Sequence, residues 1–501
     1  MRPQRKRFCQ GFVVAAVGLI NLASALGQDL KQDLDKSLQL TENPPMEIIF
    51  EPAPPLPEPS DDFEIRKGFT LVDNLDDFRA AIKENRQKIR LKPGHYVAKK
   101  LDEPLILPEG HFMSESGQVR HEHVFFITSS NSHFDMRGAV ITIPSSLKGK
   151  MPRKAHVADN WRVGGSRNTI EGGYFRTETD LQYPKYFGGG NLFEVHNKGN
   201  KFIDCTFHVK GSSPFGYSDY YGKGSKNWVS MNKHSFMSLN HANKTVLKGC
   251  RIYHQAFGHA IHFHNVSDVL IEDCYFTGAL RRTRDIFKEK TGLAREHKFN
   301  IMYRGERPIP RDEVIPLVED GIRTYDNCRN IIVRDTTVAR FRNSAAFNAV
   351  GDVRLENVQF FESGDHSIIA TASENGRVIV KNCSSDVAYN PVFGTGHMPA
   401  VRGKYEVTIL SPAKDVEFTP RSNLGTICGI KCHFILRDGT ERPLPPKVNV
   451  LTCGGKYPLT ESLVENFTPA TIILEKNVTK CIIKSAGRVI DRGKGNRIIQ
   501  L

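Results

Sequence analysis

The sequence lacks the short motifs that identify a chemistry by themselves. It contains no phosphate-cradling glycine loop, no His-Glu-x-x-His and no Cys-x-x-Cys zinc pattern, and we find no nucleic-acid-binding motif. Beyond residue 27 it also has no apolar run of the roughly 20 residues that a membrane-spanning helix needs. These absences weigh against a P-loop enzyme, a zinc protease and an integral membrane protein.

A basic start and a short apolar run mark residues 1–27. Arg2, Arg5, Lys6 and Arg7 precede an apolar stretch at 11–25 that ends in small residues. This pattern is typical of a secretory signal peptide, and an uncleaved anchor is the alternative. We expect residues 1–27 to be removed and the mature protein to be soluble, either secreted or periplasmic.

Residues 28–66 show no sustained periodicity. Prolines crowd part of this segment, at positions 44, 45, 52, 54, 55, 57 and 59. Such a composition predicts an extended spacer that packs against nothing. We expect folding to begin near Phe69, with a helix capped by Asn74 that places Leu75, Phe78 and Ile82 on one face.

A repeat of short apolar segments organises the middle of the chain. Within residues 235–276 one pattern occurs twice, and its cysteines, Cys250 and Cys274, are 24 residues apart. Alternating apolar residues predict strands, and a repeat of this length predicts a solenoid. The pattern recurs at 134–139, 169–173, 202–205, 332–336, 353–358 and 378–383. Where repeats are 22 to 25 residues apart no room is left for crossover helices, so we expect an all-β coil.

Each repeat places an acidic, amide or glycine residue before a small inward one. Four of the ten cysteines occupy that inward position, namely Cys205, Cys250, Cys274 and Cys383. Buried cysteine packs as a small hydrophobe, so we expect core thiols here rather than disulfides. The later Cys428, Cys432, Cys453 and Cys481 could pair in three ways.

The repeat pattern fades after Asn390. Short β segments between glycine and proline turns follow to the end of the chain. We therefore predict a coil domain at 67–400 and a β-rich C-terminal cap or module at 401–501.

Strand alternation also predicts which side chains face outward. With Met237, Leu239, Ile261 and Phe263 pointing inward, their neighbours form two outward columns. One column holds Glu194, Ser238, His262, Arg323 and Ala346, and the other holds His196, Asn240, His264, Tyr325 and Asn348. These columns supply acids, bases and carboxylate-binding donors within a few strand spacings. We interpret them as a candidate site, the alternative being a solvated ladder with no role.

Two long insertions interrupt the coil beside this face. Residues 210–233 are rich in tyrosine and glycine and include Tyr217, and residues 274–336 carry many cations, among them Arg281 and Arg282. Loops of this size inside compact domains are usually functional. We expect Tyr217, Arg281 and Arg282 to wall a groove along the coil, unless the basic insertion is only a solvated surface.

The net charge of +14 favours an acidic partner. Because the chain is expected to be exported and lacks a nucleic-acid motif, an extracellular polyanion is the better candidate than a nucleic acid. His262 and His264 are spaced to bind a metal from one strand face, but the sequence shows no clear third ligand.

The coils, the Lys-Pro-Gly-His-Tyr entrance at 92–96 and the outward polar columns together resemble the pectate-lyase-like superfamily. The resemblance covers about residues 69–393 and implies a right-handed parallel β-helix with an N-terminal helical cap. It further implies binding or cleavage of a polysaccharide along the outward strands, and it allows for a Ca²⁺ cofactor. Segments 258–260 and 321–324 are faintly similar to elements of polygalacturonases. The aspartate pair of those hydrolases is missing, because Ser238-Leu239-Asn240 stands at the matching strand.

The outward residues fit β-elimination better than hydrolysis. Elimination needs a group that neutralises a uronate carboxylate, a base for the C5 proton and an acid for the leaving oxygen. We assign Arg323 and Asn240 to the first role, His262 or Lys233 to the second, and Tyr325 or His264 to the third. Glu194, His196, Asn348, Asn240 and His264 are expected to contact substrate.

The sequence thus predicts an exported monomeric lyase, or a C5-epimerase, acting on an acidic polysaccharide. One alternative is a glycoside hydrolase that uses Glu194 with Glu319 or Asp320, which would need two carboxyls roughly 6.5 to 9.5 Å apart to invert. The other is a non-catalytic β-helix that binds or adheres to polysaccharide.

Overall fold

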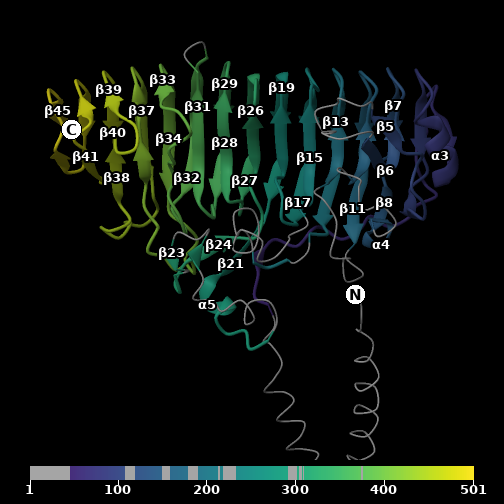
Figure 1. The fold of residues 1–501 in the computed structure, drawn as a ribbon, viewed down its shortest axis with the longest axis horizontal. Coiled ribbons are helices and arrows are strands. Elements are labelled where there is room, and N and C mark those ends of the chain that lie inside the picture. The colour runs from purple at the N-terminus through teal and green to yellow at the C-terminus, as the bar shows by residue number, and fades with distance from the viewer. Residues whose placement is uncertain are drawn as a thin grey trace, which may run out of the picture.

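The chain winds into one long stack of parallel coils (Figure 1). The computed structural model describes residues 46–107, 119–148, 158–178, 190–212, 215–217, 233–291, 302–303, 307–308, 310–373 and 376–501. The expected signal peptide, the first part of the expected linker and most of the tyrosine-rich insertion lie outside these ranges. The predicted all-β parallel coil is confirmed.

Three parallel faces make up the coil. The largest sheet supplies two of them and contains β2 (Thr70–Val72), β3 (Lys88–Leu91), β4 (Gly94–Val97), β7 (His133–Asp135), β8 (Ala139–Pro144), β10 (Thr169–Glu171), β11 (Tyr174–Glu178), β13 (Lys201–Ile203), β14 (Thr206–Lys210), β16 (Val246–Lys248), β17 (Arg251–Gln255), β19 (Ser267–Glu272), β20 (Tyr275–Thr277), β26 (Arg329–Arg334), β27 (Thr337–Ala339), β29 (Val353–Glu356), β30 (Gln359–Phe361), β32 (Val378–Asp386), β34 (Lys404–Leu410), β37 (His433–Gly439), β40 (Leu463–Asn466), β43 (Ile482–Ser485) and β45 (Arg497–Gln500).

The third face carries the predicted outward columns, and we call it the site face. Its strands are β5 (Leu105–Leu107), β6 (Val119–Ile127), β9 (Ala158–Val163), β12 (Asn191–Val195), β15 (Ser235–Asn240), β18 (Ile261–His264), β25 (Ile322–Tyr325), β28 (Asn343–Ala349) and β31 (His366–Ala372). From β6 onward these strands pair in parallel and in spatial order, so residues at one level of the coil form straight columns.

A left-handed backbone corner explains the acid, amide or glycine of each repeat. The residue before the inward small one has a positive φ in coil after coil, at Gly138, Gly172, Asp204, Gly249, Asp273, Asp335, Asn357, Asn382, Lys431 and Lys480. Glycine, asparagine and aspartate adopt this conformation at the least steric cost. The corner then turns the following residue into the core.

The core is a set of inward ladders of like side chains. Trp161 stacks between Phe125 and Phe193, with ring centroids 4.0 and 5.5 Å away. Cys205, Cys250, Cys274 and Cys383 are buried free thiols, as predicted, and the four later cysteines are buried and free as well.

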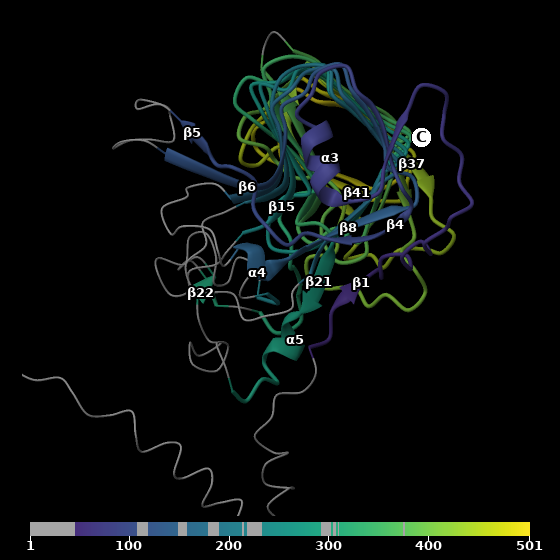
Figure 2. The same cartoon turned by 90° about the vertical axis from the view of Figure 1, so that its right-hand side faces the viewer.

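A helix closes the N-terminal end of the coil. Helix α3 (Leu75–Ala81) begins at Asn74, whose side chain accepts hydrogen bonds from the backbone N–H groups of Asp76 and Asp77 at 3.1 and 2.9 Å. Seen along the coil, α3 lies across its opening (Figure 2), and Phe78 makes an edge-to-face contact with Phe134. The predicted helical cap is confirmed, and it covers apolar surface that an open coil would expose.

The proline-rich segment is extended but does not stand free, which corrects its interpretation as an unpacked spacer. Within residues 46–66, β1 (Ile49–Phe50) pairs antiparallel with β21 (Ala279–Arg282). Further along, the backbone oxygens of Pro54 and Pro57 accept hydrogen bonds from Tyr174 and His95 at 3.3 and 2.8 Å. Proline fixes φ, so the extended segment loses little entropy on docking along the coil.

The last hundred residues continue the coil, so they are not a separate module. β32 pairs in parallel with β34, and β34 with β37, across the boundary expected at residue 400. The site face is continued by β35 (Gly425–Ile427), β38 (Val450–Cys453), β41 (Thr471–Leu474) and β44 (Val489–Asp491), which Phe393 joins to β31. A further short parallel sheet contains β33 (Ala400–Val401), β36 (Gly429–Ile430), β39 (Leu459–Thr460) and β42 (Val478–Thr479). The repeat pattern fades there because Lys431 and Lys480, rather than an acid, amide or glycine, occupy the left-handed corners.

The basic insertion forms a small projection from the coil (Figure 1). β21 pairs antiparallel with β24 (Val314–Pro316), and helix α5 (Thr283–Ile286) follows β21. Two strands of two residues each, β22 (Met302–Tyr303) and β23 (Arg307–Pro308), pair antiparallel in the same insertion. Elsewhere, the short helix α4 (Ser145–Lys148) follows β8. In the described ranges no helix is both long and apolar enough to cross a membrane.

The coil contains one buried acid whose charge opposes folding. Asp386, 5% exposed at the end of β32, accepts a hydrogen bond from the Glu362 N–H at 3.0 Å. Burial raises its pKa to about 7. The native state therefore holds this proton more tightly than the unfolded chain, and stability is lost as the pH rises between the unfolded and folded pKa values.

Replacing Asp386 with Asn should remove that loss. We expect D386N to gain up to about 4 kcal/mol over the wild type at pH 8 and little at pH 4, as urea unfolding at both pH values would measure. The exposed Asp312→Asn is the matched control. A gain that does not depend on pH would contradict the assignment.

Candidate active site

The two outward columns lie in the predicted register on the site face. Ser238 pairs with His262 and His262 with Arg323, while Asn240 pairs with His264 and His264 with Tyr325. Adjacent strands lie about 4.8 Å apart, so the His262, His264, Arg323 and Tyr325 side chains share one patch.

His259 and Tyr325 form a hydrogen-bonded pair at the centre of this patch. The Asp320 N–H donates to His259 Nδ1 at 3.2 Å, so the neutral ring carries its proton on Nε2. Nε2 lies 2.9 Å from the Tyr325 hydroxyl oxygen and donates to it. Burial lowers the pKa of His259 and raises the pKa of Tyr325. The tyrosine thus keeps its proton and can direct it away from His259.

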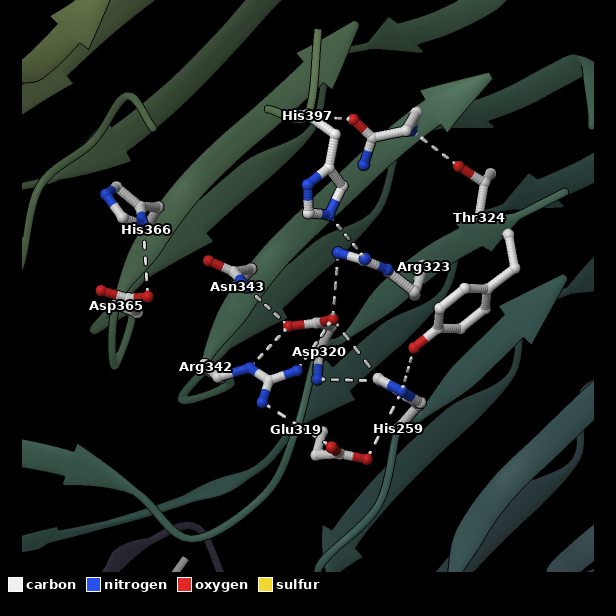
Figure 3. Close-up of polar contacts among 12 residues, drawn as sticks. His259, Glu319, Asp320, Arg323, Thr324, Arg342, Asn343, Asp365, His366 and His397 are labelled. Atoms are coloured by element: carbon white, nitrogen blue, oxygen red, sulfur yellow. Dashed lines mark hydrogen bonds and ion pairs between the residues drawn. The ribbon is translucent and has the colours of Figure 1, made fainter. Parts of the chain in front are cut away.

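Two buried carboxylates, Glu319 and Asp320, lie next to His259 and are held by cations (Figure 3). Glu319 Oε1 accepts a hydrogen bond from Lys233 Nζ at 2.6 Å. Asp320 accepts from Arg342 Nε at 3.0 Å and from Asn343 Nδ2 at 2.7 Å.

Both carboxylates stay ionised. Burial alone would raise the pKa of Glu319, but His259, Lys233 and Arg342 outweigh it and lower the pKa to about 2. Arg342 and His259 likewise hold the pKa of Asp320 far below its ordinary value against the effect of burial. Neither group can therefore serve as a general acid near neutral pH.

His262 is an unprotonated base beside this pair. Its ring centroid lies 5.4 Å from those of both His259 and His264. Its Nδ1 atom is buried and has no hydrogen-bond partner in the described structure. Burial, reinforced by the two neighbouring histidines, holds the pKa of His262 well below its ordinary value. Its neutral ring therefore has a free lone pair or proton at Nδ1.

His264 is turned to the outer edge of the patch. Its ring stacks on Tyr325 at a centroid distance of 5.0 Å, and its Nδ1 lies 2.8 Å from Asp326 Oδ2. It therefore orients the tyrosine ring and is less well placed than Tyr325 to contact a buried leaving oxygen.

Arg323 lies over the Tyr325 ring, and its guanidinium group is next to the His397 side chain. Its guanidinium carbon is 4.9 Å from the Tyr325 ring centroid, and its Nη2 is 3.4 Å from His397 Nε2. The His397 backbone is fixed from both sides, because its N–H donates to Asn348 Oδ1 at 3.1 Å and its carbonyl oxygen accepts from the Tyr457 hydroxyl at 2.6 Å. Arg323 is thus held where it can pair with an anionic group above Tyr325.

The remaining predicted contacts on the face are more distant or already engaged. Glu194 lies on β12 and His196 directly follows that strand, with His196 Nε2 3.1 Å from Glu194 Oε1. Asn240 Oδ1 is 2.8 Å from His241 Nδ1, and Asn348 supports His397. These residues line the coil beside the patch instead of completing it.

Tyr217, Arg281 and Arg282 do not lie on the site face, which corrects the expectation that they wall a groove. The Tyr217 hydroxyl donates to Glu289 at 2.7 Å, and Arg281, 2% exposed, donates to the same carboxylate at 2.6 Å. Arg282 Nη1 is 3.5 Å from Glu417, in the projection formed by the insertion. These side chains fasten the two insertions to each other and to the coil.

Sequence reasoning missed the residues that position the patch. His259, Asp320, Asn343 and His366 occupy one level of the coil, just before the regular strand alternation begins. The segment around His259 gave only a faint family similarity, and Glu319 and Asp320 were recognised only as nearby acids. The alternation of inward and outward side chains applies within a strand. It therefore does not predict the orientation of residues at the corner before a strand.

Metal binding finds little support in this geometry. Among the described residues, no group of three or more His, Cys, Asp and Glu side chains is arranged to hold a metal ion. The ring centroids of His262 and His264 are 5.4 Å apart, the two rings are nearly perpendicular, and they contact different neighbours.

The Glu319 ion pairs should give stability that disappears in acid. Because the folded pKa is lowered, this stability is present above the unfolded pKa and is lost as the pH falls toward 2. We expect E319Q to lower the free energy of unfolding by about 3 kcal/mol at pH 7, with the deficit shrinking below pH 4. Urea unfolding across that range measures it, with the surface-paired Glu272→Gln as control. An equal deficit at all pH values would contradict the charge argument.

Solved structures align with this chain at low sequence identity. No family model and no curated protein sequence matches the chain. A PL6 alginate lyase in complex with a trisaccharide aligns with a TM-score of 0.43 and 10% identity, covering 86% of this chain and 89% of its own. The A-module of the Azotobacter vinelandii mannuronan C-5 epimerase AlgE6 aligns at 0.32 and 8%, covering 85% and 93%. PfbA, a surface adhesin of Streptococcus pneumoniae, aligns at 0.32 and 11%, covering 82% of each chain.

At such identities and TM-scores no residue role passes from one chain to another. The parallel pairing of successive coils defines the fold of this chain directly. Crossovers between parallel strands are right-handed in nearly all proteins. The chain is therefore a right-handed parallel β-helix.

Proposed function

We propose that this protein is an exported enzyme that abstracts the C5 proton from uronate units of an acidic polysaccharide. The observation that carries the proposal is the His259–Tyr325 hydrogen bond beside the unprotonated His262, with Arg323 above. The net charge of +14 fits an acidic polymer. Export rests on the pattern of residues 1–27, which lie outside the described ranges.

The proposed chemistry begins with recognition of the carboxylate. Arg323 pairs with the uronate carboxylate and stabilises the negative charge that develops there when C5 loses its proton. Neutral His262 takes that proton. His262 suits this role better than Lys233, because the Lys233 ammonium group already donates to Glu319 at 2.6 Å.

Tyr325 completes either of two outcomes. In β-elimination the C5–H electron pair forms the C4=C5 double bond, the C4–O bond breaks, and the Tyr325 hydroxyl protonates the leaving oxygen. In epimerisation the same hydroxyl returns a proton to C5 from the opposite face. In both, the His259 Nε2–H stabilises the resulting phenolate at 2.9 Å.

The hydrolase alternative fits the geometry less well. A glycosidase needs a carboxylic acid with a raised pKa, whereas the pKa of Glu319 is about 2 and that of Asp320 is also lowered. Glu194 accepts a hydrogen bond from Asn191 and lies on β12, away from Tyr325. A non-catalytic binder would leave the polymer intact, and the assay below separates it.

Removing the Tyr325 hydroxyl should abolish turnover but not binding. The wild type is expected to generate unsaturated uronate, followed by its ultraviolet absorbance, on at least one of pectin, alginate and glycosaminoglycans. We expect Tyr325→Phe to lower kcat by about 10²- to 10⁴-fold with KM nearly unchanged. Tyr174→Phe, which removes a hydroxyl bonded to Pro54 on another face, is the matched control. The lyase version fails if no uronate polymer gives the signal, with or without Ca²⁺.

The pH profile should extend further into acid than that of an ordinary histidine. The active form needs neutral His262, whose pKa is lowered, and protonated Tyr325, whose pKa is raised. We expect kcat/KM to stay level from well below pH 6.5 to about pH 10, the ordinary values for the two residue types. An acid limb centred near pH 6.5 would count against His262 as the base.

A further inference from the structure

A polar hollow lies beyond the candidate active site on the same side of the coil. Its volume is about 280 Å³. Its polar lining consists of His366, Thr395, Asn423, Thr426, Lys447 and Thr452. The volume is close to the lower end of the range for small-molecule sites.

The hollow and the active site are joined along the strands. Asn343, which donates to Asp320, pairs with His366 at the edge of the hollow (Figure 3). From β25 the ladder runs through β28 and β31 to Phe393 and then to Gly425. Those strand steps amount to about 19 Å, so one extended polymer can contact Arg323 and the hollow together.

Two glycines keep the hollow open where the chain passes close to other groups. A Cβ on Gly394 would lie 2.5 Å from Cγ of His366. Gly425 has a φ of +87°, and a Cβ there would lie 2.0 Å from the Phe393 oxygen. A larger residue at position 394 would have to displace the His366 side chain, and one at position 425 the Phe393 backbone.

The charge of the lining favours an anion. Arg421 forms an ion pair with Asp365 beside His366, so those charges compensate each other. Lys447 is exposed, makes no hydrogen bond or ion pair with another described residue and is the only fully charged side chain of the lining. Hydroxyl and amide groups of Thr426, Thr452 and Asn423 complement sugar hydroxyls.

We propose that this hollow is a distal subsite that binds a further uronate unit of the same polymer, with Lys447 pairing its carboxylate. The inference rests on the proposed function in naming the ligand, but its binding test does not require turnover. It predicts that affinity rises with oligomer length once a chain reaches from Arg323 to Lys447.

The test measures calorimetric binding of defined oligouronates, from trimers to octamers of guluronate, mannuronate and galacturonate. We expect Lys447→Met to weaken binding of the long oligomers about three- to tenfold and to leave trimers unchanged. Lys476→Met, an exposed lysine on a later turn, is the charge-matched control and should change neither. Carboxyl-reduced long oligomers should bind the wild type and Lys447→Met alike.

Three outcomes would overturn the subsite. These are equal loss for trimers and long oligomers, the same loss in Lys476→Met, and no loss in Lys447→Met although the wild type gains affinity with length. Thr452→Val gives a second variant that keeps strand propensity and should also weaken only long oligomers. If long oligomers bind through Lys447 but no turnover occurs, the chemistry of the proposed function fails while the subsite stands.

Discussion

The left-handed corner that closes each coil is the constraint on which the rest of the structure depends. It turns one small residue into the core per coil, at Cys205, Cys250 and Cys274 for example, and so fixes the register of the strands that follow. Because side chains alternate along a strand, a slip of one residue would exchange the core and the site face. Repetition of the corner holds residues from distant parts of the sequence in straight columns.

In the candidate site, the rigid coil holds side chains that stay charged next to side chains that stay neutral. Asp320 and Glu319 remain charged within a cluster of cations, and their network fixes His259. His259 in turn holds the Tyr325 hydroxyl, while His262 stays neutral above. β-Elimination and epimerisation both need an unprotonated base and a proton donor, and here the two groups lie on neighbouring strands.

Much of the fold could be predicted from sequence because its signals are local. The period of two, the corner residues and the Asn74 cap each depend on a few adjacent residues, and all of them are found in the structure. The alternation of inward and outward side chains also predicted that His262 and Arg323 lie in one outward column. By contrast, lysines at positions 431 and 480 adopt the left-handed corner conformation, where earlier coils have an acid, an amide or glycine. The final coils could therefore not be recognised from the sequence pattern.

The contributions of His259, Asp320 and Arg342 depend on contacts between coils that no sequence period encodes, as does the burial of Arg281 with Glu289.

The measurement that bears most directly on the chemistry is nuclear magnetic resonance of a polyuronate treated with the enzyme in deuterated water. Proton abstraction predicts deuterium at C5 or a C4=C5 double bond in the product. New reducing ends that keep the original C5 hydrogen, or an unchanged polymer, would contradict it.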